Sequence, residues 1–275
     1  MTAAPPRMLW LAAGSVLALV LAVSAGLSLV GWSAGSVERT EHHVLGGGVT
    51  QLRIDGGLAD VTLTPTAGDR VVVDSRAKAS LWMPEPRTRV DGNRVSLGGG
   101  CRVAVFGSCS ASFVVRVPHG VGVSVATATG DVRADGLTGP LELHVSSGDV
   151  ELSGLSGGTT AKVASGDIDA SRLSGRVELE TASGDVRATG LDSGVVNARA
   201  SSGDVLVDLA AAPQRVNLAS TSGDVTILVP RDRASYDTQL ATSSGETDPG
   251  VPSDPNASRS LSAVTSSGDA AIRYR

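Results

Sequence analysis

The sequence predicts an all-β protein, a single-stranded parallel β-solenoid of stacked 18–23-residue coils. An N-terminal β capping region and one transmembrane helix are expected to precede it. Three observations carry this prediction: Ser-Gly-Asp or a close variant recurs eight times from residue 129 onward, apolar and polar residues alternate between the recurrences, and residues 8–32 are uncharged. A period near 20 residues is typical of folds in which one supersecondary unit stacks on the next. Alternation with period two is typical of half-buried strands.

The apolar N-terminal segment is the first predicted element. Residues 8–32 are rich in Leu, Val and Ala, and the stretch from Trp10 to Trp32 would be roughly 33 Å long as a helix, enough to cross a bilayer. We expect a cytoplasmic N-terminus (1–7), a transmembrane anchor (8–32) and a linker (33–43), with the rest of this single-pass chain extracytoplasmic. A signal peptide cleaved near Val23-Ser24-Ala25 is the alternative, and it also implies export.

Residues 44–119 are predicted to cap the first coil. They contain alternating strands without the tripeptide, separated by the turn sequences Gly56-Gly57 and Asp91-Gly92-Asn93. Such a cap protects the open edge of a stack from pairing with other chains. The only two cysteines, Cys101 and Cys109, lie here, and in an exported protein we expect them to form a disulfide rather than two free thiols.

Residues 120–275 are the predicted solenoid repeats. Each unit has a short strand after the tripeptide, a turn with a leucine such as Leu137, and a second strand, and equivalent strands are expected to stack about 4.8 Å apart. Glycine permits a positive φ at the corner, and Ser and Asp bond to nearby backbone groups. Leu261–Tyr274 is predicted as the last coil. The predicted repeat corners are Gly130, Asp131, Gly148, Asp149, Gly166, Asp167, Gly184, Asp185, Gly203, Asp204, Gly223, Asp224, Gly245 and Gly268.

The aspartate column allows two interpretations. Stacked carboxylates could bind a ladder of calcium ions, or each could accept a hydrogen bond from a backbone N–H group. Calcium requires six or more oxygen ligands, and the dense nine-residue repeat of calcium β-rolls is absent from the sequence. We therefore expect backbone hydrogen bonds, and we predict no metal or cofactor site.

Outward charged residues are expected to pair between coils, as Lys162 with Glu180 and Arg133 with Glu151. Glu151 and Asp169 could alternatively be the catalytic carboxylates of a polysaccharide-acting β-helix enzyme, but nothing in the sequence indicates a substrate cleft. The net charge of −5 argues against a nucleic-acid partner. Only Lys78 and Lys162 are lysines, so the sequence predicts no polybasic lipid-binding tract. The sequence therefore predicts a protein without catalytic activity.

The Ser-Gly-Asp-Val repeats, together with Val115–Gly120 and Ile227–Pro230, resemble the bacterial DUF4097 family, described as β-strand-repeat candidate adhesins. The resemblance covers most of residues 49–275. It implies a solenoid fold, an envelope location and an adhesin-like role, and it supplies no catalytic residue. We expect a membrane-anchored interaction module whose partner is an envelope component or a protein. The alternative is the ectodomain of an envelope-stress sensing or regulatory system. Glu246 departs from the usual Asp of the repeat.

Overall fold

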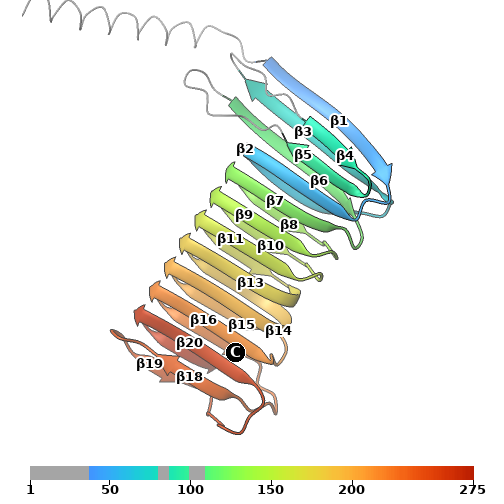
Figure 1. Cartoon of the computed structure of the whole chain (residues 1–275). Coiled ribbons are helices and arrows are strands. Elements are labelled where there is room, and N and C mark those ends of the chain that lie inside the picture. Colours follow the sequence, from blue (N-terminus) through green and yellow to red (C-terminus); the bar gives the residue numbers. More distant parts are fainter. Residues whose placement is uncertain (1–36, 80–86, 99–108) are drawn as a thin grey trace, which may run out of the picture.

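The structure is a computed structural model that describes residues 37–79, 87–98 and 109–275 (Figure 1). These residues form 21 strands, so the all-β prediction is confirmed. The predicted cytoplasmic terminus (1–7), the predicted anchor (8–32) and Cys101 lie outside the described residues. Within the described ranges we find no helix with the length and apolar character needed to cross a bilayer.

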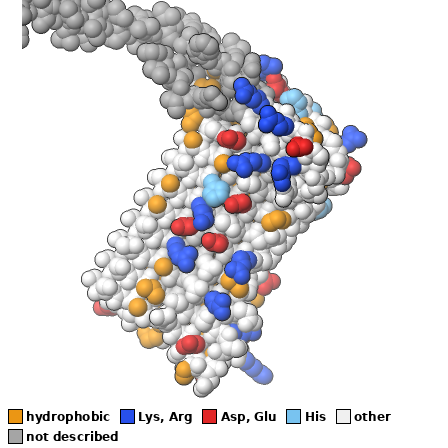
Figure 2. Space-filling view, viewed as in Figure 1, with side chains coloured by type: hydrophobic (Ala, Val, Ile, Leu, Met, Phe, Trp, Pro, Cys, Tyr) orange, Lys and Arg blue, Asp and Glu red, His pale blue; other side chains and the backbone are white. Residues whose placement is uncertain are grey.

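Two sheets face each other across one core, and each turn of the chain adds a strand to both. β9 (Leu141–Ser147) belongs to the sheet that faces the viewer in Figure 1, here called the front sheet, and β10 (Val150–Ser153) belongs to the back sheet. Eighteen residues later, β11 (Thr159–Ser165) pairs in parallel with β9, and β12 (Ile168–Ser171) with β10. The repeat of the sequence is therefore the repeat of the stack, which forms an elongated slab (Figure 2).

The spatial order of the strands defines the two sheets. The front sheet consists of β4 (Arg87–Asp91), β5 (Arg94–Gly98), the first half of β2 (Gln51–Thr66), β7 (Gly122–Thr129), β9, β11, β13 (Ser174–Ser183), the second half of β14 (Val186–Ser202), β16 (Arg215–Ser222), β20 (Ser260–Ser267) and β18 (Asp237–Ala241). The back sheet consists of β1 (Val37–Gly47), β3 (Arg70–Ala79), β6 (Cys109–Pro118), the second half of β2, β8 (Val132–Asp135), β10, β12, the first half of β14, β15 (Val205–Leu209), β17 (Val225–Val229), β21 (Ala270–Tyr274) and β19 (Thr247–Pro249).

The core consists of columns of small aliphatic side chains. Every second residue of each inner strand points inward, so that Val132, Val150 and Ile168 lie above one another and are buried. The turn leucines, such as Leu137 and Leu155, close one side of the core and are also buried. Burying a Val or Leu side chain contributes about 1.5–3 kcal/mol, so the stability of the stack grows with each coil.

The stack reaches further toward the N-terminus than the repeated tripeptide does. The first half of β2 pairs with β7 in the front sheet, and its second half pairs with β8 in the back sheet, so β2 is itself a complete coil. β5 and β6 flank it on the other side, and β1, β3 and β4 complete that end with antiparallel pairings. The segment between Gly56 and Asp60 turns the corner without a Ser-Gly-Asp tripeptide.

The prediction that Leu261–Tyr274 forms the last coil is wrong in space. β20 and β21 lie between the β16–β17 coil and the β18–β19 coil, although β18 and β19 precede them in sequence. The physical reason is the distribution of apolar side chains. Leu261, Ala263 and Ile272 are fully buried, whereas β18 and β19 are largely exposed. The more apolar coil thus occupies the inner place, and the more polar coil covers the end.

Candidate functional site

The repeated glycines form one column along an edge of the stack. Gly166 has φ +139°, a conformation that side-chain-bearing residues rarely adopt, and a Cβ added to it would lie 2.7 Å from the carbonyl carbon of Gly148. Only glycine allows the backbones of neighbouring coils to approach this closely. The column contains Gly130, Gly148, Gly166, Gly184, Gly203, Gly223, Gly268 and Gly245, in that spatial order.

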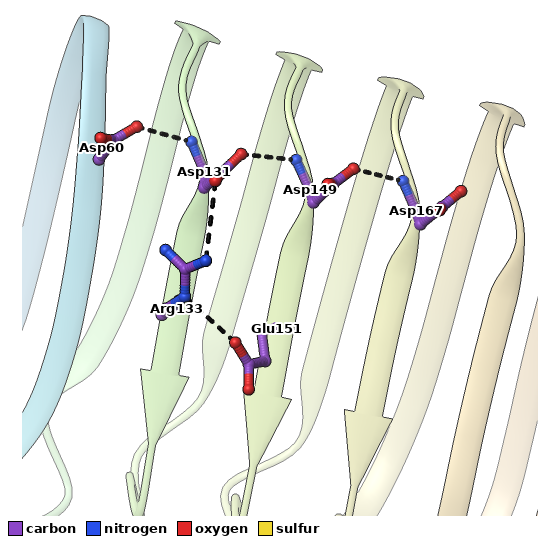
Figure 3. Close-up of polar contacts among 6 residues, drawn as sticks. All are labelled: Asp60, Asp131, Arg133, Asp149, Glu151 and Asp167. Atoms are coloured by element: carbon purple, nitrogen blue, oxygen red, sulfur yellow. Dashed lines mark hydrogen bonds and ion pairs between the residues drawn. The ribbon is translucent and has the colours of Figure 1, made fainter.

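The aspartate after each glycine joins one coil to the next. The backbone N–H of Asp149 donates to Oδ1 of Asp131 at 3.1 Å, and that of Asp167 donates to Oδ1 of Asp149 at 3.0 Å (Figure 3). The same bond joins the later coils, in the order Asp167, Asp185, Asp204, Asp224 and Asp269. Hydrogen bonds to charged groups are stronger than neutral ones, so this aspartate ladder adds to the cohesion between coils.

The two ends of the ladder explain its irregular members. Asp60 of β2 begins it by accepting from the N–H of Asp131 at 3.0 Å, although no tripeptide marks this coil. At the other end, Glu246 donates its backbone N–H to Oδ1 of Asp269 at 2.8 Å. No described coil follows Glu246, so no N–H group of a further described coil donates a hydrogen bond to its carboxylate. The corner therefore does not require an aspartate there.

The carboxylates of the aspartate ladder do not form a metal site with other side chains of the described residues. Among the described residues, no group of three or more His, Cys, Asp or Glu side chains is arranged to hold a metal ion. One oxygen of each aspartate that is followed by another coil is engaged by a backbone N–H. The geometry of this edge is accounted for by bonding between coils.

Buried hydroxyl groups reinforce the same corners from inside. Thr181 donates to the carbonyl oxygen of Gly166 at 3.0 Å, and Thr265 donates to that of Gly223 at 2.9 Å. Thr181 is buried, because it takes an inward position in the alternation of β13. The glycine carbonyl of the neighbouring coil becomes visible only when the coils are stacked, and it satisfies the hydroxyl there.

Outward charged residues pair across neighbouring coils. Nε of Arg133 lies 3.1 Å from Glu151, and Nζ of Lys162 lies 3.4 Å from Glu180, so both predicted pairs are confirmed. These side chains are about half exposed, and such pairs contribute less than about 1 kcal/mol each. Asp169 lies opposite both Glu151 and Arg187 on the exposed side of the back sheet.

The front sheet has a shallow groove of about 620 Å³ across β2, β7, β9, β11, β13 and β14. Small side chains form its floor: Ala128, Ser146, Ala164 and Ala182, at equivalent positions of successive coils. His144, Lys162 and Glu180 stand along one side of it. The groove was not predicted, because its residues lie 18 apart in sequence and their common position follows from the parallel register.

A polar cluster lies on the back sheet near the β1 end. Nδ1 of His42 lies 2.5 Å from Oδ1 of Asp74, and Nη2 of Arg116 lies 3.1 Å from Oδ2 of the same carboxylate. The hydrogen bond from His42, followed by the charges of Arg116 and His42, holds the pKa of Asp74 below its usual value despite the opposing effect of partial burial. Cys109 is the first residue of β6, the strand that also contains Arg116. Because Cys101 lies outside the described residues, the disulfide stays a prediction.

Solved structures and one family model are similar to this chain. The fold matches a candidate adhesin from Bacteroides fragilis with a TM-score of 0.50 and 14% identity, covering 88% of this chain and 99% of that one. A candidate adhesin from Parabacteroides merdae matches with a TM-score of 0.37 and 9% identity, covering 86% and 95%. At 14% identity, the likeness to the Bacteroides fragilis protein concerns the fold alone. No curated protein matches the sequence. The model of the Toastrack family, DUF4097, matches residues 49–274, and the chain therefore belongs to this family.

Proposed function

We propose that this chain is a non-catalytic, adhesin-like interaction module of the bacterial cell envelope. In this proposal residues 8–32 anchor it in the membrane, and the rest of the chain is a parallel β-solenoid on the extracytoplasmic side. Its partner would be an envelope component or another protein rather than a nucleic acid. The parallel registers of both sheets and the uncharged N-terminal segment support the two structural parts of the proposal.

The groove of the front sheet is the single observation that carries the binding role. It extends over six strands, and its floor of small side chains lets a ligand approach the sheet closely. The sheet beneath is held by ladder hydrogen bonds on both sides of every strand from β7 to β14, which preorganises the surface. A preorganised surface binds without a large cost in ordering entropy. The description of the Bacteroides fragilis relative as a candidate adhesin is consistent with such a role.

The test is capture of envelope components by the full-length chain in lipid nanodiscs. A164R fills the floor of the groove, whereas A219R places the same side chain on the outer side of β16, beyond the groove. Wild type and A219R should retain the same wall or envelope material from fractionated cells. The amount retained by A164R should be at least tenfold lower. Equal retention by both variants would exclude the groove as the contact surface. No specific retention by the wild type would exclude the interaction role.

A further inference from the structure

Four arginines gather on the outer side of the front sheet at the end that holds β1 and β4. They are Arg53 of β2, Arg87 and Arg89 of β4, and Arg94 of β5. Arg89 lies opposite Ser96, and Ser96 lies opposite Arg53, so the side chains share one side of the sheet. Figure 2 shows blue side chains gathered at this end. We call these four residues the arginine patch.

The charges of the arginine patch are available to a partner. All four side chains are exposed, and none takes part in an ion pair within the described residues. Arg94 donates two hydrogen bonds, of 3.0 and 2.8 Å, to Oε1 of Gln51, which is uncharged. Asp55 and Asp91 lie on the same side of the sheet, which leaves an excess of two positive charges. This contrasts with the net charge of −5 for the chain.

The back sheet at the same end is different, because three of its basic side chains contact carboxylates. Arg76 and Lys78 both pair with Glu38, at 3.3 and 3.2 Å, and Arg116 pairs with Asp74. Arg76, Lys78 and Arg116 on the back sheet thus have acidic partners, whereas the four residues of the arginine patch have none within the described residues. An excess of positive charge on one side attracts anionic partners to that side.

The position of the patch along the chain points to the bilayer. β1 begins at Val37, five residues after Trp32, where the proposed anchor ends. An extended chain spans at most about 3.6 Å per residue, so Val37 lies within about 18 Å of the membrane boundary. This step rests on the proposed anchoring. The end of the stack that holds the arginine patch is then the end nearest to the membrane.

We propose that the arginine patch docks onto anionic phospholipid headgroups of the membrane in which the chain is anchored. Guanidinium groups bind phosphate oxygens through two parallel N–H donors and keep their charge at all physiological pH values. A basic side chain close to an anionic surface raises the binding constant about fivefold. Several such contacts would fix the orientation of the stack relative to the bilayer.

Hydrogen exchange of the full-length chain in nanodiscs tests the proposal. Nanodiscs of phosphatidylcholine are compared with nanodiscs that also contain phosphatidylglycerol. The triple variant R53Q/R87Q/R89Q removes most of the patch, and its matched control R176Q/R199Q/R215Q removes three exposed arginines from more distant strands of the same sheet. In wild type and control, phosphatidylglycerol should slow exchange in β4 and β5, and 1 M salt should abolish the effect. In the patch variant the equilibrium constant for docking should fall by about a hundredfold.

Three results would overturn the proposal. The first is equal hydrogen exchange of β4 and β5 in the two kinds of nanodisc, and the second is a loss of protection in the control variant equal to that in the patch variant. The third is protection of β4 and β5 by soluble polyphosphate in neutral nanodiscs that is at least as strong as the protection by phosphatidylglycerol. Failure of the proposed anchoring is detected separately, because the chain would then not float with neutral vesicles. In that case, flotation with phosphatidylglycerol vesicles becomes the test of the patch. Wild type and control should float with them, and the patch variant should not.

Discussion

Replacing a corner glycine by alanine should show how much stability depends on the close approach of neighbouring coils, as distinct from the positive φ of an ordinary turn. Gly166 has φ +139°, and an added Cβ would lie 2.7 Å from the carbonyl carbon of Gly148. Backbone strain at such a φ costs about 1–3 kcal/mol, and relief of the steric contact costs about 1–3 kcal/mol more. G166A should therefore destabilise the protein by about 2–6 kcal/mol.

Gly154 provides the matched control. It also has a positive φ, +64°, but its nearest neighbouring atom would be 3.8 Å from an added Cβ, so G154A should cost only about 1–2 kcal/mol. The assay is urea unfolding of the full-length protein, followed by the β signal in circular dichroism. A destabilisation by G166A no greater than that by G154A would refute the argument that the close approach of neighbouring coils requires glycine.

Three further perturbations follow from the contacts between coils. D167A removes the acceptor of one ladder hydrogen bond and should cost about 1 kcal/mol in urea unfolding, whereas E246A, at the free end of the ladder, should cost less than about 0.5 kcal/mol; equal effects would contradict the ladder. Deletion of residues 260–275 removes the strand partners of β18 and β19, so rapid hydrogen exchange is expected across residues 237–249, and retained protection there would contradict the spatial order. The folded-state pKa of Asp74 is lowered, so its stabilising contribution is complete above the usual carboxyl value of 3.8 and is lost as the pH falls through the lowered pKa. D74N should remove this part of the acid dependence of unfolding, and an unchanged profile would contradict the cluster with His42.

The inner part of the stack could be predicted because each coil repeats the same local pattern. The tripeptide indicates the corner, and alternation indicates which side chains enter the core. The β2 coil lacks the tripeptide, but it keeps another regularity. Leu52 precedes Val61 by nine residues, as Leu141 precedes Val150, and all four side chains are buried. This offset between inward positions would have identified the additional coil from the sequence.

The order of the final coils and the arginine patch depend on contacts between distant segments. The spacings of 22 and 23 residues near the C-terminus are compatible with inserted residues in a sequential stack and with an exchange of two coils. The two final coils exchange places because the β20–β21 coil buries more apolar surface than the β18–β19 coil. Predicting this requires comparing the two possible stacking orders, which the sequence pattern alone does not do. Likewise, Arg53 and Arg89 are 36 residues apart, and only the pairing of both strands with β5 brings them to one surface.

The uniform junction between inner coils has a consequence for the length of the molecule. Each of these coils offers the same hydrogen-bonding pattern to the coil before it and to the coil after it. Duplication or excision of one 18-residue unit, such as residues 148–165, would therefore restore a matching junction. Gene duplication within this region could change the reach of the protein in steps of one coil, while the specialised ends stay the same.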